Sequence, residues 1–206
     1  MLARLSPLCQ CYHLARQIRE ERVPAMSGNQ PGDETGDGRN GAPPPDLSSH
    51  GPPDVTADGP RLGPGVYGVV FEIDRQVSVA TGKLGQLVYP AGGYLYIGSA
   101  MGGISGRVRR YLDTPKRTFW HIDYLLPRGR AVAIVAGESD RRVECDLARD
   151  IGRQFTVVKR FGSSDCQCAG HLFHGGAARP LTDALVAALR AVGCRPRFVL
   201  DRSASS

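Results

Sequence analysis

Long apolar runs are absent from this sequence of 206 residues. The longest apolar stretches, such as Ala131–Ala136, match a buried strand in length and fall far short of the roughly 18 residues that a membrane-spanning helix needs. The first 25 residues also lack the apolar core of a secretory signal, and Glu20 and Glu21 are unusual for a transit peptide. We therefore expect a soluble, cytoplasmic protein without a membrane partner.

Cysteine is also scarce, and its placement is uneven. The six cysteines are too few and too irregularly spaced for a disulfide framework, which favours a reducing compartment. They are Cys9, Cys11, Cys145, Cys166, Cys168 and Cys194.

Large apolar residues are nearly missing from the stretch 27–60, which is dominated by Gly, Pro, Asp, Ser and Asn. Such a composition buries too little surface to offset its ordering entropy, so residues 1–60 are predicted to be a disordered tail. Met26 offers an alternative start, and one hypothesis treats 1–25 as a miscalled leader. The rest is predicted to be one domain over 61–176, with a C-terminal helix and short strand over 177–206 packed on it.

Charge is distributed unequally between the tail and the predicted domain. Residues 1–60 hold 5 basic and 8 acidic side chains, whereas residues 61–206 hold 21 and 12 and carry a net charge of +9. A surplus of this size favours polyanionic partners, because binding a phosphate backbone releases counterions. Solubility alone would explain the same composition, so the charge by itself leaves both interpretations open.

Alternating residues predict two tyrosine-bearing strands. Val66–Ile73 places Tyr67 on one face, and Gly93–Gly98 places Tyr94 and Tyr96 on one face. The connection between them predicts a small hairpin, with arms near Val77–Val79 and Gln86–Val88.

A helix is predicted over Ile104–Leu112, where Arg107 and Tyr111 are neighbours at i and i+4 and can face one ligand. Further basic residues on or after this helix suggest a phosphate-contacting surface, with a merely solvated face as the alternative. They are Arg109, Arg110, Lys116 and Arg117.

A third strand is predicted over Arg130–Gly137, followed by a helix capped by Ser139 or Asp140. The buried stripe of that helix is formed by Val143, Leu147 and Ile151. Glu144 lies beside the stripe, where a carboxylate is well placed to bind a hard cation. A last amphipathic helix carries Leu181, Leu185, Leu189 and Val192, and the extended segment Phe198–Leu200 follows it.

Taken together, these motifs resemble the GIY-YIG nuclease superfamily. Gly65–Tyr67 looks like the GIY element, Tyr96–Gly98 like the YIG element, Arg107–Tyr111 like the following helix, and Val143–Ala148 like the metal-binding helix. The closest similarity is to Uri-type endonuclease domains, and it covers roughly Gly63–Phe173. It is carried by Gly82–Gly85, Tyr96–Ala100, Trp120–Leu125 and Phe161–Cys166.

The resemblance implies an α/β fold, with a small three-stranded antiparallel sheet flanked by helices, and a metal-dependent endonuclease acting on nucleic acid, with DNA favoured over RNA. It implies Glu144 as the ligand of Mg²⁺ or Mn²⁺ and Arg107 as the cation that steadies the scissile phosphate. Tyr67 corresponds to a general base or a positioning group, and Tyr96 and Tyr111 to groups that orient water and phosphate.

Many superfamily members carry an asparagine after the metal-binding helix, where this chain has Arg160–Cys166. Asp165 is the candidate polar substitute, and His121 is a candidate cleft residue beside Trp120 and Asp123. The alternative function is a nucleic-acid-binding module that retains the fold without hydrolysis.

Thiols and imidazoles gather in one short segment, Cys166–His174. Cys166, Cys168, His171 and His174 are ligand types that zinc prefers, but their spacing differs from familiar zinc fingers, so buried thiols are the favoured interpretation over structural zinc. A weaker alternative assigns Cys166 as a nucleophile with His171 as its base.

Overall fold

A computed structural model describes residues 61–112 and 118–202 of the protein. The predicted tail, the alternative start at Met26, Lys116 and Arg117 lie outside the described residues. In chain order the strands are β1 (Gly65–Ile73), β2 (Val77–Ala80), β3 (Gln86–Tyr89), β4 (Gly92–Ala100), β5 (Arg130–Glu138), β6 (Thr156–Val158), β7 (Leu172–Gly176) and β8 (Arg197–Asp201). The α-helices are α2 (Ile104–Leu112), α3 (His121–Leu125), α4 (Glu144–Ile151) and α5 (Ala178–Ala191), with short 3-10 turns η1 (Gly82–Leu84) and η2 (Leu126–Arg128).

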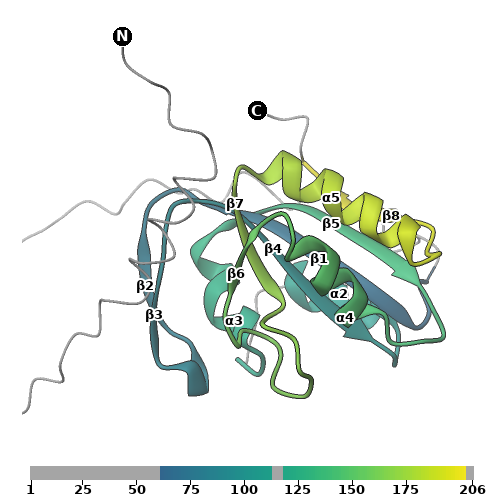
Figure 1. The fold of residues 1–206 in the computed structure, drawn as a ribbon, viewed down its shortest axis with the longest axis horizontal. Coiled ribbons are helices and arrows are strands. Elements are labelled where there is room, and N and C mark those ends of the chain that lie inside the picture. The colour runs from purple at the N-terminus through teal and green to yellow at the C-terminus, as the bar shows by residue number, and fades with distance from the viewer. Residues whose placement is uncertain (1–60, 113–117, 203–206) are drawn as a thin grey trace, which may run out of the picture.

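The fold is built on an antiparallel sheet in the order β6-β7-β4-β1-β5-β8 (Figure 1). β1 lies between β4 and β5 and pairs with both along nearly its whole length. The α/β class and the antiparallel sheet are therefore confirmed, but the expectation of three strands is wrong. Of the further strands, β8 contains the predicted extended segment Phe198–Leu200, whereas β6 and β7 were not expected. β6 and β7 are short, and each is defined by pairing with a neighbour rather than by a clear alternation of its own.

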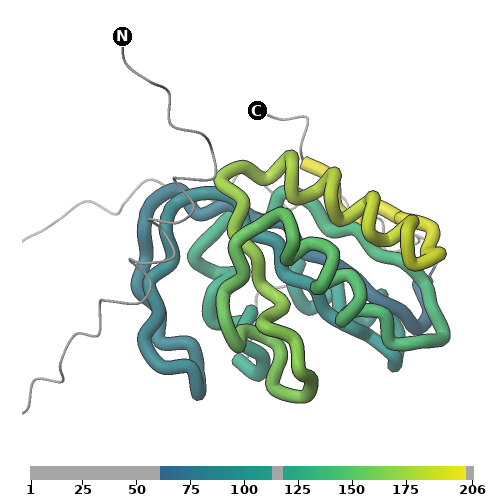
Figure 2. Tube along the Cα trace, in the orientation of Figure 1, coloured from purple at the N-terminus to yellow at the C-terminus, as the bar shows by residue number. Residues whose placement is uncertain are grey.

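Helices cover both faces of the sheet, which gives two apolar cores (Figure 2). α4 and α5 pack on the face that includes Val66, Val70 and Leu95. α2, α3 and the β2–β3 hairpin pack on the opposite face, which carries Tyr67 and Tyr96. Because side chains alternate along a strand, the predicted tyrosine face is one continuous side of β1 and β4.

The predicted hairpin is confirmed as a separate two-stranded sheet of β2 and β3. Buried Thr81 and Tyr89 share a hydrogen bond of 2.9 Å between their hydroxyl oxygens. This contact joins the two arms of the hairpin, and the ring of Tyr89 packs the hairpin on the tyrosine face, where it meets Tyr94 edge to face.

The predicted cap of α4 is wrong. The helix begins at Glu144 and its N-cap is Val143, which makes no side-chain capping bond. The Ser139 hydroxyl instead bonds the backbone of Arg141, two residues along, so it stabilises its own turn. The buried stripe itself is as predicted, since Val143, Leu147 and Ile151 all lie in the core. Among the described residues, no helix combines the length and apolar character needed to cross a bilayer.

Candidate active site

Two of the predicted site tyrosines meet at their hydroxyl groups. The oxygens of Tyr67 on β1 and Tyr111 on α2 lie 2.7 Å apart, and the rings are 5.7 Å apart between centroids. Tyr67 is buried, whereas Tyr111 is partly exposed, so the pair leads from the core toward the surface. The structure thus brings together two residues that lie 44 positions apart in the sequence.

Gly98 makes room for Tyr67. The two residues are opposite each other in the β1–β4 pairing, and a Cβ placed on Gly98 would overlap the Tyr67 hydroxyl. A side chain at this position would therefore displace the phenol that reaches Tyr111. The requirement is one of space, because the ring of Tyr67 crosses directly over the neighbouring strand.

Burial governs the acidity of the three site tyrosines. It raises the pKa of Tyr111 to about 12 and raises the pKa values of Tyr67 and Tyr96 well above the ordinary value. The Arg107 guanidinium opposes the rise in the pKa of all three phenols, because its positive charge favours the ionised form of each. Neutral phenols in this arrangement are suited to donating hydrogen bonds and positioning a ligand.

Arg107 is held at the site by an aromatic ring. Its guanidinium carbon lies 3.8 Å from the centroid of the Trp120 ring, and that of Arg110 lies 4.8 Å from the same ring. Arg110 also forms an ion pair of 2.7 Å with the buried carboxylate of Asp123. Trp120 therefore orders two guanidinium groups of α2 through cation–π contacts.

Asp123 is a structural residue at the start of α3. Its Oδ2 atom accepts hydrogen bonds from Arg110 and from the backbone N–H groups of Phe119 and Trp120, at 2.7, 2.8 and 2.9 Å. The carboxylate thus fixes the segment that carries Trp120. Sequence analysis placed Asp123 only beside the candidate cleft residue His121. A helix of five residues is too short to show a periodic pattern, and the sequence does not reveal the ion pair with Arg110.

Glu144, the predicted metal ligand, is a buried carboxylate at the first position of α4. Its Oε2 atom is inaccessible to solvent and accepts no hydrogen bond from any residue in the described part of the chain. Burying a carboxylate oxygen without a partner is costly, so this atom is a natural ligand for a cation.

The segment 159–171 connects Glu144 to the tyrosines. A Cβ on Gly162 would lie 2.9 Å from the Tyr96 ring and 3.3 Å from the His171 Cβ, so Gly162 packs between these two side chains. Burial lowers the pKa of His171, and the carboxylates of Glu144 and Asp165 oppose that shift. His121 joins the same segment, since its Nδ1 accepts the Gly162 N–H at 3.1 Å.

The remaining candidates are less closely tied to the tyrosines. Arg109 is exposed on α2. Asp165 is 75% exposed and lies 4.0 Å from Arg142 in an ion pair between exposed groups. It lies on the loop between β6 and β7, and its negative charge adds a small part to the rise in the pKa of Tyr96, which burial causes first of all.

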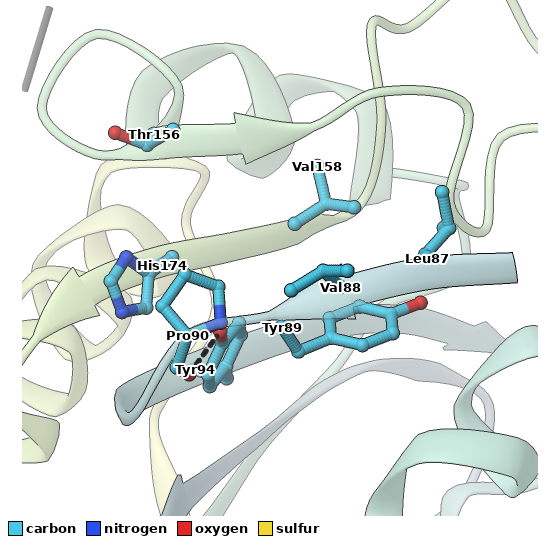
Figure 3. A pocket seen from close by; sticks show the side chains of 8 residues that line it. All are labelled: Leu87, Val88, Tyr89, Pro90, Tyr94, Thr156, Val158 and His174. Carbon is cyan, nitrogen blue, oxygen red and sulfur yellow. Dashed lines mark hydrogen bonds between the residues drawn. The ribbon is translucent and has the colours of Figure 1, made fainter. Parts of the chain in front are cut away.

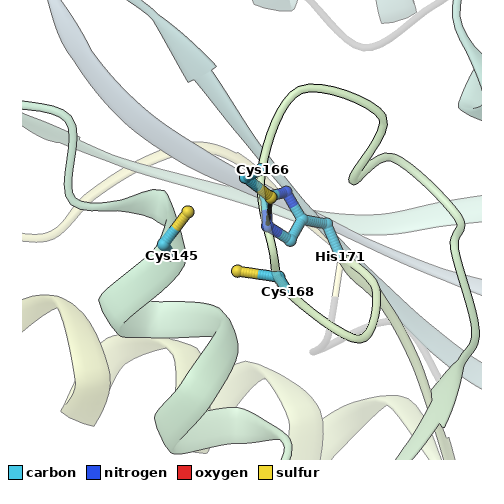
Figure 4. A group of neighbouring side chains, drawn as sticks. All are labelled: Cys145, Cys166, Cys168 and His171. Carbon is cyan, nitrogen blue, oxygen red and sulfur yellow. Dashed lines mark hydrogen bonds between the residues drawn. The ribbon is translucent and has the colours of Figure 1, made fainter.

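A group of three thiols and one imidazole lies beside Glu144. It contains Cys145 in place of His174, which the sequence had suggested as a ligand. The ligand atoms of Cys145, Cys166, Cys168 and His171 all lie within 4.8 Å of one another (Figure 4). His174 is not a member, because it lies on β7 and its Nε2 contacts the Ala91 carbonyl oxygen at 3.2 Å. The sequence missed Cys145, which α4 contributes from outside the Cys166–His174 segment.

The cavity beside His174 is not a substrate site. It has a volume of about 20 Å³ and an almost wholly apolar lining that includes Val88, Tyr94 and Val158 (Figure 3). That space accommodates about one water molecule. His174 is instead a packing residue, with its ring centroid 4.8 Å from that of Tyr94.

Comparisons with known proteins identify the chain at the level of its family. Neither the comparison with curated proteins nor the comparison with solved structures found a match. The family model described as a domain of unknown function, DUF123, matches residues 66–194, a range that contains all the site residues described above and nearly all of the sheet except β8. The chain therefore belongs to the DUF123 family.

Proposed function

We propose that this protein is a divalent-metal-dependent endonuclease that hydrolyses nucleic-acid phosphodiester bonds, with DNA as the favoured substrate. The observation that carries the proposal is the buried Oε2 atom of Glu144, which has no hydrogen-bond partner among the described residues. The GIY-YIG resemblance of β1, β4, α2 and α4 supports the same interpretation, as does the convergence of Tyr67, Tyr111 and Arg107.

Glu144 fits the role of a Mg²⁺ or Mn²⁺ ligand. A carboxylate oxygen is the donor that these hard cations prefer, and one protein carboxylate with bound water is a common arrangement for Mg²⁺. When bound, the metal would supply Lewis acidity at the phosphate and stabilise developing charge. The carboxylate is held in place because Glu144 is buried in the first turn of α4.

Arg107 is the residue best suited to contact the scissile phosphate. A guanidinium stays charged at all physiological pH values and binds phosphate oxygens through paired hydrogen bonds. Its stacking on Trp120 restricts the side chain before the substrate arrives, so less conformational freedom is lost on binding.

The tyrosines support positioning more strongly than proton abstraction. Burial raises the pKa of Tyr67 well above its ordinary value, so the phenol of the free protein keeps its proton at neutral pH. Tyr67 and Tyr111 can therefore orient water or a phosphate oxygen through their paired hydroxyl groups. Tyr96 contributes a third phenol near the same guanidinium.

The surface around Arg107 favours a nucleic-acid ligand. Residues 61–206 carry a net charge of +9, and exposed Arg109 lies on the same helix. Phe119, next to Trp120, is 76% exposed, and an exposed aromatic ring beside basic groups is a typical platform for stacking an unpaired base. Arg110 forms an ion pair with Asp123, so we assign it a structural role rather than a contact with the nucleic acid.

The test is cleavage of end-labelled single-stranded DNA, duplex DNA and RNA by the full-length protein with Mg²⁺, with Mn²⁺ and with chelator. We expect metal-dependent cleavage that is lost in Glu144→Gln and in Arg107→Ala. Glu72→Gln and Arg190→Ala are the matched controls. Glu72 is a surface carboxylate in an ion pair with Arg130, and Arg190 is an exposed arginine of α5. Both controls should cleave like the unmodified protein.

The alternative is a binding module that retains the fold without hydrolysis. It predicts salt-dependent binding of nucleic acid by the unmodified protein and no cleavage with any metal. The assignment of Glu144 would also be contradicted if the Glu72→Gln control lost cleavage to the same extent as Glu144→Gln.

A further inference from the structure

We propose that Cys145, Cys166, Cys168 and His171 form a structural zinc site that ties the N-terminus of α4 to the loop between β6 and β7. This site is separate from the proposed metal position at Glu144. It does not depend on the proposed nuclease activity, because its ligands are soft thiolates and an imidazole rather than a single carboxylate.

The geometry fits a four-coordinate ion. In a tetrahedral site with Zn–S bonds of about 2.3 Å, the ligand atoms lie about 3.5–4 Å apart. The four ligand atoms here all lie within 4.8 Å of one another, and the Cys166 sulfur is 3.6 Å from the His171 Nε2. Closure around zinc therefore needs only small side-chain shifts, and three thiolates with one imidazole form a common structural zinc set.

The ligands come from two parts of the chain, which explains the unusual sequence spacing. Cys145 projects from the first turn of α4, and the other three ligands project from the loop facing it (Figure 4). Cys166–His171 alone is too compact to surround an ion, but a fourth ligand from the opposite side completes the shell. An entry path exists, since Cys145 and Cys168 also line a groove of about 610 Å³.

The same loop contains a strained backbone conformation, whose cost a metal cross-link would offset. Arg160 has a φ of 62°, a left-handed conformation that is strained for a residue with a side chain. A backbone hydrogen bond of 2.6 Å from the Arg160 N–H to the Ala169 carbonyl oxygen closes the same loop. Zinc bound next to this closure would hold the loop rigidly, and it would fix Glu144 because Cys145 is the adjacent residue.

The first experiment measures zinc by elemental analysis in full-length protein purified under reducing conditions. We expect one zinc per chain in the unmodified protein and a loss of most of it in Cys145→Ala and Cys168→Ala. Cys194→Ala is the matched control, because Cys194 is a buried free thiol outside the group, and it should retain zinc. Chelation should lower the melting temperature of the unmodified protein and of Cys194→Ala.

A second measurement remains informative if the cysteine variants fail to fold. Cobalt substituted into the unmodified protein should give the intense thiolate-to-cobalt absorption of a tetrahedral three-sulfur site, and zinc should displace it. The proposal is overturned if reduced protein binds neither zinc nor cobalt. It is also overturned if Cys194→Ala loses as much zinc as Cys168→Ala, or if intact mass shows a disulfide within the group.

Discussion

The hydroxyl oxygens of Tyr67 and Tyr111 lie 2.7 Å apart, and they join the central strand of the sheet to the helix that carries Arg107. Only one of the two phenols, Tyr111, retains partial access to solvent. Removal of the Tyr111 hydroxyl therefore leaves a buried hydroxyl without a partner, whereas removal of the Tyr67 hydroxyl leaves a partly exposed one.

Tyr111→Phe should destabilise the fold by about 1–3 kcal/mol, because it leaves the buried Tyr67 hydroxyl without a partner. The double variant with Tyr67→Phe should recover part of that loss, since two apolar rings leave no buried polar atom unpaired. Denaturant unfolding of the two single variants and the double variant measures the coupling. Strictly additive effects would contradict the buried pair.

Gly98→Ala should reduce cleavage by about 100-fold, because the added methyl displaces the Tyr67 hydroxyl from the site. The same overlap should lower stability by about 1–3 kcal/mol. Gly102→Ala is the control, since a Cβ there meets no atom within 4 Å. Cleavage kinetics and thermal unfolding of both variants give the comparison, and equal behaviour of the two would argue against a steric role for Gly98.

Asp123→Ala should lower the free energy of unfolding by about 2–3 kcal/mol, since it removes three hydrogen bonds to one buried carboxylate oxygen. Glu72→Ala should cost less than about 1 kcal/mol, because its ion pair with Arg130 is solvent-exposed. Chemical denaturation distinguishes the two. Asp123→Asn should fall between them, as the amide oxygen still accepts hydrogen bonds.

Alkaline conditions should unfold the protein through its buried tyrosines. Burial raises the pKa of Tyr89 and of Tyr111 to about 12, and Tyr67, Tyr94 and Tyr96 shift in the same direction. The folded state therefore holds these phenolic protons more tightly than the unfolded chain, in which they dissociate near pH 10. Their contribution to stability is complete below about pH 10 and is lost as the pH rises through about 12.

Melting temperatures measured alongside tyrosinate absorbance test this dependence. The melting temperature should begin to fall near pH 10, and the buried phenols should ionise only as the protein unfolds. Ionisation of all seven tyrosines near pH 10 in protein that remains folded would contradict the burial of these side chains.

Strong periodicity made the central part of the fold predictable. Alternation in Val66–Ile73 and Gly93–Gly98 identified β1 and β4, and the apolar stripe of Val143, Leu147 and Ile151 identified α4. β7 was missed because LFHGG has no alternation, and its strand conformation depends on pairing with β4 and β6. The GIY-YIG assignment itself stays a prediction.

Contacts between distant segments limited the prediction of the site. The sequence indicated that Arg107 and Tyr111 share one helix face, and it selected Tyr67 separately. The hydroxyl pair and the Trp120 stack could not be predicted, because they depend on how α2 and α3 pack. Cys145 was missed because helical position, and not sequence spacing, brings it to Cys166 and Cys168. Its adjacency to Glu144 in the first turn of α4 was the available signal.

The pairing of β8 with β5 has a consequence for synthesis of the protein. β5 lies beside the central strand, yet one of its edges is covered only by residues Arg197–Asp201. A nascent chain emerges from the ribosome with that edge uncovered, and an uncovered apolar strand edge is a template for association with other chains. Until β8 emerges, this edge is therefore a place at which the growing polypeptide can associate with other chains.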